Sequence, residues 1–243
     1  MHKVELSIPG VIDQLYPQTA FHLLRLLERA GCEVSYNPLQ TTCGIDLYEA
    51  GYWEEAKEIG AKYLNDFEGI DYIVSPSFTE VGMIRDGFND LFTNSTDHNK
   101  CRQMQRNIFE ISDFLVNVVR KEYFGAEFVS TAIFHPSCAQ WNGYQLHDEA
   151  LRLLKQVGGL ELITDKQPSK SCKIGRATKA DYVPLSVAWG TEVIEYGMAN
   201  KADYIICQDH TCLLHLQGII EKKEFPIQTI HLVDVLTAGW PNI

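Results

Sequence analysis

Short apolar runs alternate with longer stretches of helical periodicity along the first half of the chain. The apolar runs are typical of buried strands, and in the stretches between them apolar residues recur every three or four positions, as on one face of a helix. The predicted strands are residues 4–8, 32–36 and 72–74, and the predicted helices are residues 19–30, 52–65, 79–91 and 101–120. Gly31, directly after the first long helix, is typical of a helix C-terminus.

The second half repeats this order of strands and helices. Its predicted strands are residues 128–134, 160–164, 204–207 and 227–232, and its predicted helices are residues 148–157, 185–199 and 212–221. The segment Tyr72-Ile73-Val74-Ser75 lies 132 positions before Tyr204-Ile205-Ile206-Cys207, Cys43 lies 130 before Lys173, and Pro9 lies 129 before Cys138. Similar residues at a nearly constant offset indicate an internal duplication.

These patterns predict an α/β protein of two similar lobes, residues 1–125 and residues 126–243. Strands separated by helices of ten or more residues need crossover connections, so each lobe is expected to contain a small, mainly parallel sheet flanked by helices. Loops that follow the carboxyl ends of parallel strands are the usual place for a site. We therefore expect the site in the crevice between the two lobes.

Composition excludes several classes of protein. The 243 residues are 45% hydrophobic and 22% charged, and 21 basic against 32 acidic side chains give a net charge of −11. Such a charge argues against a nucleic-acid partner, because binding to phosphate backbones needs a basic surface. No apolar run is long enough for a membrane span, and neither a G-x-G-x-x-G motif nor a P-loop predicts a nucleotide cofactor. The short apolar N-terminus does not resemble a signal peptide, so a cytoplasmic location is expected.

Seven cysteines in a chain without an export signal favour thiols over a disulfide framework. The second half carries four potential metal ligands in loops that follow predicted strands: Cys138, Cys172, His210 and Cys212. Three thiols and one imidazole form a competent tetrahedral zinc site, and thiolates also suit an iron–sulfur cluster. The alternative is that these cysteines only pack in the core as small apolar side chains, with His210 a polar loop residue.

The chain resembles the cysteine-rich (CCG) domain family of iron–sulfur proteins over essentially its whole length. The resemblance is carried by residues 23–34, by Thr42-Cys43-Gly44, by residues 72–77 and by His135-Pro136-Ser137-Cys138. It implies the iron–sulfur electron-transfer subunit of a complex that oxidises L-lactate or another 2-hydroxy acid. It also implies that the other subunits of such a complex are its partners.

The chain departs from the family pattern mainly in its first half. Where the resemblance implies cysteines, this chain has Pro9, Thr42-Cys43 and Glu80. The first half is therefore expected to hold no cluster, and Cys43 and Glu80 remain as candidate cofactor-binding residues. The alternative for Glu80 is a structural role, because a carboxylate near a helix N-terminus is stabilised by the helix dipole.

Two functions stay open at this point. One is an electron-transfer subunit in which the second half keeps a zinc ion or a histidine-ligated cluster on Cys138, Cys172, His210 and Cys212. The other is a non-catalytic partner or regulatory protein of the same fold, either zinc-binding or metal-free. No catalytic residue is assigned, and the oligomeric state is open.

Overall fold

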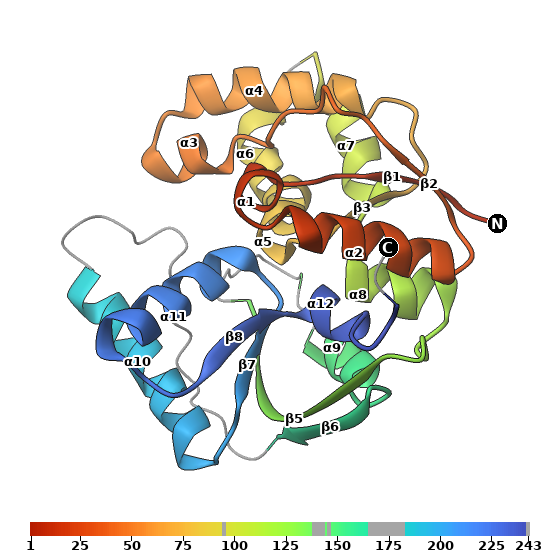
Figure 1. The fold of residues 1–243 in the computed structure, drawn as a ribbon. Helices are drawn as coiled ribbons and strands as arrows, with labels where there is room; N and C mark the ends of the chain where they lie inside the picture. The colour runs from red at the N-terminus through yellow and green to blue at the C-terminus, as the bar shows by residue number, and fades with distance from the viewer. Residues whose placement is uncertain (94–95, 138–143, 145–146, 165–182, 242–243) are drawn as a thin grey trace. The chain divides into compact units, whose positions relative to one another are not determined.

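The computed structural model describes residues 1–93, 96–137, 144, 147–164 and 183–241. The chain divides into two compact units, of which the first contains Met1–Val119 with Gln140–Gln145, and the second contains Arg120–Ala139 with Leu146–Ile243 (Figure 1). Each unit has its own four-stranded sheet. No helix in the described part of the chain has the length and apolar composition needed to cross a membrane.

The first unit is built on a parallel sheet with strand order β2-β1-β3-β4. Its strands are β1 (Lys3–Leu6), β2 (Glu33–Tyr36), β3 (Ile73–Ser75) and β4 (Ile108–Glu110). Its helices are α1 (Gly10–Leu15), α2 (Pro17–Arg29), α3 (Ile45–Ala50), α4 (Trp53–Asp66), α5 (Phe78–Gly82), α6 (Phe88–Phe92), α7 (His98–Asn107) and α8 (Ile111–Asp113). π-Helical segments follow α5 (Met83–Gly87) and α8 (Phe114–Val119).

Helices lie on both sides of this sheet. Figure 1 shows α1 and α2 on one side of it, and α4, α6 and α7 on the other. The inner strands of a parallel sheet that is covered on both faces are largely buried and mainly apolar. This explains why β3 is fully buried. It also explains why the sequence shows short continuous apolar runs.

The second unit repeats the architecture. Its parallel sheet has the order β6-β5-β7-β8, formed by β5 (Glu127–His135), β6 (Gly158–Ile163), β7 (Tyr204–Cys207) and β8 (Gln228–His231). Its helices are α9 (His147–Leu154), α10 (Val183–Ala199), α11 (His210–Lys223) and α12 (Leu232–Leu236). Counted within each unit, the strand order is the same, which confirms the predicted fold class of two similar α/β lobes with parallel sheets.

The predicted helix over residues 101–120 is wrong. Its first part is α7, but Ile108–Glu110 leaves the helix and pairs with β3 as the edge strand β4. Ile108 and Glu110 are fully buried there. A strand of three residues between two helical segments keeps the apolar spacing of a helix, so periodicity alone could not separate them.

Candidate functional site

Polar side chains stand in a row where three strands of the first sheet end. Ser7 directly follows β1, and Ser75 and Glu110 are the last residues of β3 and β4. The register places them at one level, because Leu6 pairs with Val74 and Ser75 pairs with Glu110. The row therefore lies at the carboxyl edge of the sheet, where α/β proteins usually bind ligands.

The second sheet carries an equivalent row with different chemistry. His135, Cys207 and His231 are the last residues of β5, β7 and β8 and are paired in register. All three are buried. Sequence reasoning assigned His135 and His231 no part in the site. His135 directly follows the apolar run Ala132-Ile133-Phe134, and that position was the available signal, whereas His231 lay inside the predicted strand 227–232.

The helix that follows the central strand begins in the same way in both units. Ser77 caps α5 and Asp209 caps α11, and each is the second residue after its strand. Glu80 and Cys212 are each the fifth residue after the same strands. Glu80 of the first unit therefore occupies the position that Cys212 occupies in the second.

Glu80 is a buried carboxylate held by hydroxyl groups. Its Oε2 accepts hydrogen bonds from Ser75 Oγ at 2.6 Å and from Ser7 Oγ at 3.0 Å. Ser7 Oγ lies 2.5 Å from the hydroxyl of Tyr63. Because Ser7 has one proton and gives it to Glu80, Tyr63 is the donor of that last bond. The result is a chain of hydrogen bonds from α4 through the carboxyl ends of β1 and β3 to α5.

Cys43 lies close to this carboxylate. Burial and then the charge of Glu80 raise the pKa of the Cys43 thiol well above its usual value, so the thiol stays protonated at neutral pH. The structure thus brings together Cys43 and Glu80, the two predicted cofactor-binding residues. Their surroundings offer a carboxylate, hydroxyls and one protonated thiol. This donor set does not fit an iron–sulfur cluster, which is held by cysteine thiolates.

In the second unit, His210 is the first residue of α11 and is 1% exposed. Burial lowers the pKa of its imidazole to about 4, against the opposing charges of Asp209 and Asp234. Its ring stacks on that of His231 with centroids 4.0 Å apart. At neutral pH His210 is therefore a neutral imidazole, the form in which histidine binds metals.

His231 has a structural role. Its Nδ1 accepts a hydrogen bond from the backbone N–H of Val233 at 3.2 Å and so caps α12. In the neutral ring this places the proton on Nε2. In the same row, burial and, to a smaller extent, the charge of His215 lower the pKa of His135 to about 4.

The predicted metal set of Cys138, Cys172, His210 and Cys212 stays a prediction. Cys138 and Cys172 lie outside the described residues. His210 and Cys212 are both buried, but they are two positions apart in α11 and so about 200° apart around the helix. Within the described ranges, no three His, Cys, Asp or Glu side chains gather in a group that could hold a metal ion. His210 and Cys212 are donor types that zinc accepts, and a site on both would require their side chains to turn towards one ion.

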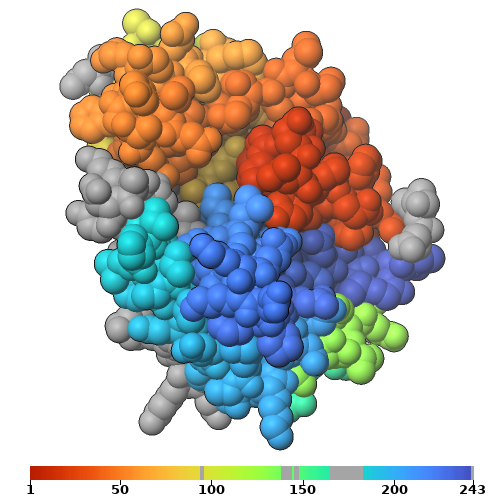
Figure 2. All heavy atoms as spheres, turned by 60° about the vertical axis from the view of Figure 1, so that its left-hand side comes forward, coloured from red at the N-terminus to blue at the C-terminus, as the bar shows by residue number. Residues whose placement is uncertain are grey.

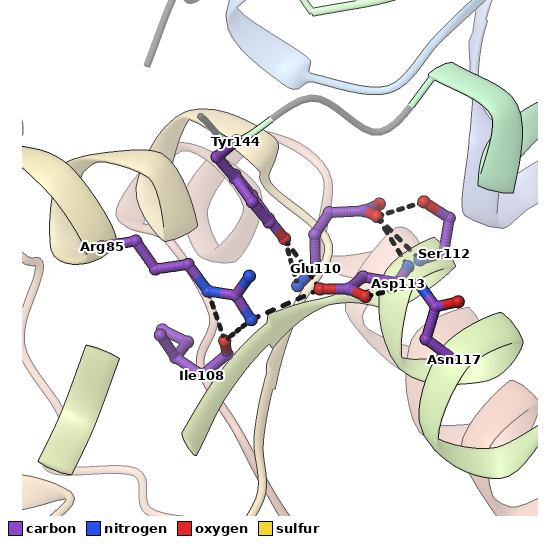
Figure 3. A network of polar contacts seen from close by, with 7 residues as sticks. All are labelled: Arg85, Ile108, Glu110, Ser112, Asp113, Asn117 and Tyr144. Atoms are coloured by element: carbon purple, nitrogen blue, oxygen red, sulfur yellow. Dashed lines mark hydrogen bonds and ion pairs between the residues drawn. The ribbon is translucent and has the colours of Figure 1, made fainter. Parts of the chain in front are cut away.

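A second polar network in the first unit surrounds Glu110, as Figure 3 shows. Glu110 Oε2 accepts hydrogen bonds from the backbone N–H of Ser112 at 2.8 Å and from its hydroxyl, and so caps α8. Arg85 forms an ion pair with Asp113 at 3.3 Å and lies 4.4 Å from the centre of the Tyr144 ring. The hydroxyl oxygen of Tyr144 in turn accepts a hydrogen bond from the backbone N–H of Glu110.

Burial raises the pKa of Glu110 to about 8, although hydrogen bonds from Ser112 and Asp113 oppose the shift. Oε1 of this carboxyl group has no hydrogen-bond partner among the described residues. The group is therefore largely protonated at neutral pH. Sequence reasoning missed Glu110, because it assigned this segment to a helix.

Comparison with known proteins identifies the family. The family model of the cysteine-rich domain, CCG, matches residues 10–84 and 132–217. The chain belongs to the cysteine-rich domain family. The two matched segments contain all six predicted site residues: Cys43 and Glu80 in the first, and Cys138, Cys172, His210 and Cys212 in the second.

Curated relatives match over nearly their whole length. The chain is 32% identical to lactate utilization protein A of Geobacillus thermodenitrificans, covering 96% of this chain and 98% of that protein. It is also 32% identical to lactate utilization protein A of Geobacillus kaustophilus, covering 97% and 99%. A hypothetical protein of Helicobacter pylori, known from a crystal structure, shares the fold with a TM-score of 0.57 at 11% identity, over 99% of this chain and 49% of that one.

Removing one hydroxyl donor from Glu80 should destabilise this member of the cysteine-rich domain family. Ser75→Ala leaves the buried carboxylate with one hydrogen bond fewer, which costs about 1–3 kcal/mol of unfolding free energy. Ser35→Ala, at an exposed position of β2, is the matched control and should change it by less than about 0.5 kcal/mol. Urea unfolding at pH 7 measures both, and equal effects would contradict the role given to Ser75.

Glu110→Gln should change how stability depends on pH. The folded-state pKa of about 8 lies above 4.5, the ordinary value for a glutamate carboxyl group. The folded protein therefore keeps a proton that the unfolded chain releases, and the contribution of Glu110 to stability, full below pH 4.5, is lost as pH rises towards 8.

Glu110→Gln removes this titration. The difference in unfolding free energy between the variant and the wild type should therefore grow with pH in favour of the variant, by up to about 1.4 kcal/mol per pH unit. Urea titrations at pH 5, 6.5 and 8 measure this, with Glu33→Gln at an exposed position as the control. A difference that does not vary with pH would show that Glu110 is ionised in the folded protein.

Proposed function

We propose that this chain acts in lactate utilization as a subunit of a lactate-oxidising complex, and that only its second unit retains a metal or cluster site. The proposal is supported by 32% identity over nearly full length to two proteins named lactate utilization protein A. The single structural observation that carries the division between the units is the Glu80 network. It occupies, in the first unit, the position that Cys212 holds in the second.

The first unit is assigned a structural role. Glu80 is fixed by two serine hydroxyls, and Cys43 beside it is a protonated thiol. An iron–sulfur cluster would need several thiolates here. It would also have to displace the Glu80 carboxylate, which already accepts hydrogen bonds from its neighbours. The first unit then carries no electrons, and any transfer of electrons depends on the second unit alone.

The second unit is assigned the metal. His210 is neutral at physiological pH, and Cys212 is buried in the same turn of α11. Completed by Cys138 and Cys172, this set has three thiols and one imidazole. An iron–sulfur cluster on it would pass electrons between partner subunits.

A second candidate function is a zinc-binding, non-catalytic subunit of the same complex. The observation that favours it is the donor set, because three cysteines and one histidine match a closed structural zinc site without an open coordination position. Zinc in such a site would stabilise the second unit, because binding free energy of this kind appears as folding free energy.

Metal analysis of protein purified without oxygen tests both candidates. We expect one metal site per chain, lost in Cys172→Ser and in Cys212→Ser and retained in the matched controls Cys43→Ser and Cys101→Ser. Both control thiols are buried, and Cys101 lies within α7. A brown protein with iron and sulfide supports electron transfer, and a colourless protein with zinc supports the second candidate.

Growth tests the biological role. The gene should restore growth on L-lactate to a strain that lacks its own lactate utilization protein A. The Cys212→Ser variant should restore growth less well than the Cys43→Ser variant.

Two outcomes would contradict the proposal. In the metal analysis, a wild-type protein without metal would contradict the metal assignment. Failure of the wild type to support growth on L-lactate, in a strain that expresses it in folded form, would contradict the role in lactate utilization.

A further inference from the structure

A groove of about 400 Å³ lies between α2 and the outer strand of the first sheet. Its walls are mainly apolar, and its main apolar lining residues are Leu6, Ile8, Phe21, Leu24, Val34 and Tyr36. The side chains of Phe21 and Tyr36 are 60% and 45% exposed, so the groove is open to solvent. Its volume is sufficient for a large apolar side chain, and it lies within the range of ligand pockets.

The strand beside the groove has a free edge. β2 is the outermost strand, and no strand in the described part of the chain pairs with its outer side. The backbone N–H of Glu33 donates to His2 on the inner side. Because bonding directions alternate along a strand, the N–H and C=O groups of Val34 and Tyr36 point outwards. These two residues thus offer both side chains to the groove and backbone groups to a new strand.

Charge indicates what kind of segment would bind there. Asp13 is the one charged residue among the described residues that line the groove. Asp13 and Tyr36 line the same groove. Burial first and the charge of Asp13 second raise the pKa of the Tyr36 hydroxyl. The chain has a net charge of −11, so pairing with a second copy is opposed by repulsion and a basic partner is attracted.

We propose that β2 and the groove bind an extended, basic segment of a partner protein, which adds to the sheet as a further strand. One aromatic or long aliphatic side chain of the segment fills the groove. A Lys or Arg two positions away lies on the same face of the segment, about 6.6–6.8 Å along the strand, and pairs with Asp13 at the groove wall. Backbone hydrogen bonds supply affinity and the groove supplies specificity, as in strand addition generally. The proposal does not depend on any metal in the second unit.

Two peptides of identical composition test the proposal with the intact protein. In Thr-Lys-Thr-Phe-Thr-Lys-Thr, the Phe and both Lys side chains share one face of a strand in either strand direction. In Thr-Thr-Lys-Phe-Lys-Thr-Thr, Phe and Lys lie on opposite faces. Binding is measured by fluorescence anisotropy of labelled peptides at protein concentrations up to about 1 mM. The first peptide should bind at least about tenfold more tightly than the second.

Variants of the protein locate the binding. Ala20→Trp should fill the groove, and Asp13→Lys should reverse the charge at its wall. Each variant should weaken binding of the first peptide at least about tenfold. Glu54→Lys, an exposed charge reversal on α4 outside the groove, should leave binding unchanged. Thermal melting checks that each variant is folded. Asp13 is exposed, so its replacement by Lys should not disturb the core.

Equal binding of the two peptides, or binding that survives both groove variants, would overturn the proposal. Sedimentation of the free protein identifies the competing occupant. A dimer that Ala20→Trp dissociates would show that a second copy covers the groove, and the proposed partner would then be wrong.

Discussion

A buried carboxylate can persist only where donors replace the water it has lost, and Glu80 meets this requirement through Ser7 and Ser75. The two serines come from the carboxyl ends of adjacent parallel strands, and Tyr63 connects them to α4. The space at this edge of the first sheet is therefore filled by a hydrogen-bonded network that holds its own parts in place. Burial first, and the charge of Glu80 second, raise the pKa of the neighbouring Cys43 thiol and keep it protonated. The first unit thus offers a hydrogen-bonded carboxylate and a buried, protonated thiol in place of a set of thiolates.

The two units show how one framework can carry different chemistry. The strand order, the capped helix after the central strand and the polar row at the carboxyl edge recur in both. Even the capping of the last helix is shared, by Glu110 in the first unit and by His231 in the second. What differs is the side chain at each position, so the second unit has imidazoles and thiols where the first has carboxylates and hydroxyls.

Most of the architecture could be predicted from the sequence. The strand at residues 204–207 and the end of α2 just before Gly31 were predicted correctly, because apolar runs and glycines after helices are local signals. β4 was missed because a three-residue strand has too little sequence to show a period of two. The order of strands within each sheet could be expected only in outline, as parallel pairing by crossover connections.

The chemistry of the site was predictable only in part. The residue types pointed to Cys43, Glu80, His210 and Cys212, yet the state of each depends on neighbours that are distant in sequence. Ser7 is 73 residues from Glu80, and His231 is 21 residues from His210. The pKa of Glu110 and the groove beside β2 likewise arise from packing, which periodicity does not describe.

Anomalous diffraction from crystals grown without oxygen, recorded at the iron and zinc absorption edges, tests the central claim most directly. The account predicts anomalous density in the second unit, bonded to His210 and Cys212, and none within bonding distance of Glu80 or Cys43. A metal or cluster bonded to Glu80 or Cys43 would contradict it, because the hydrogen bonds from Ser7 and Ser75 would then have given way to metal coordination.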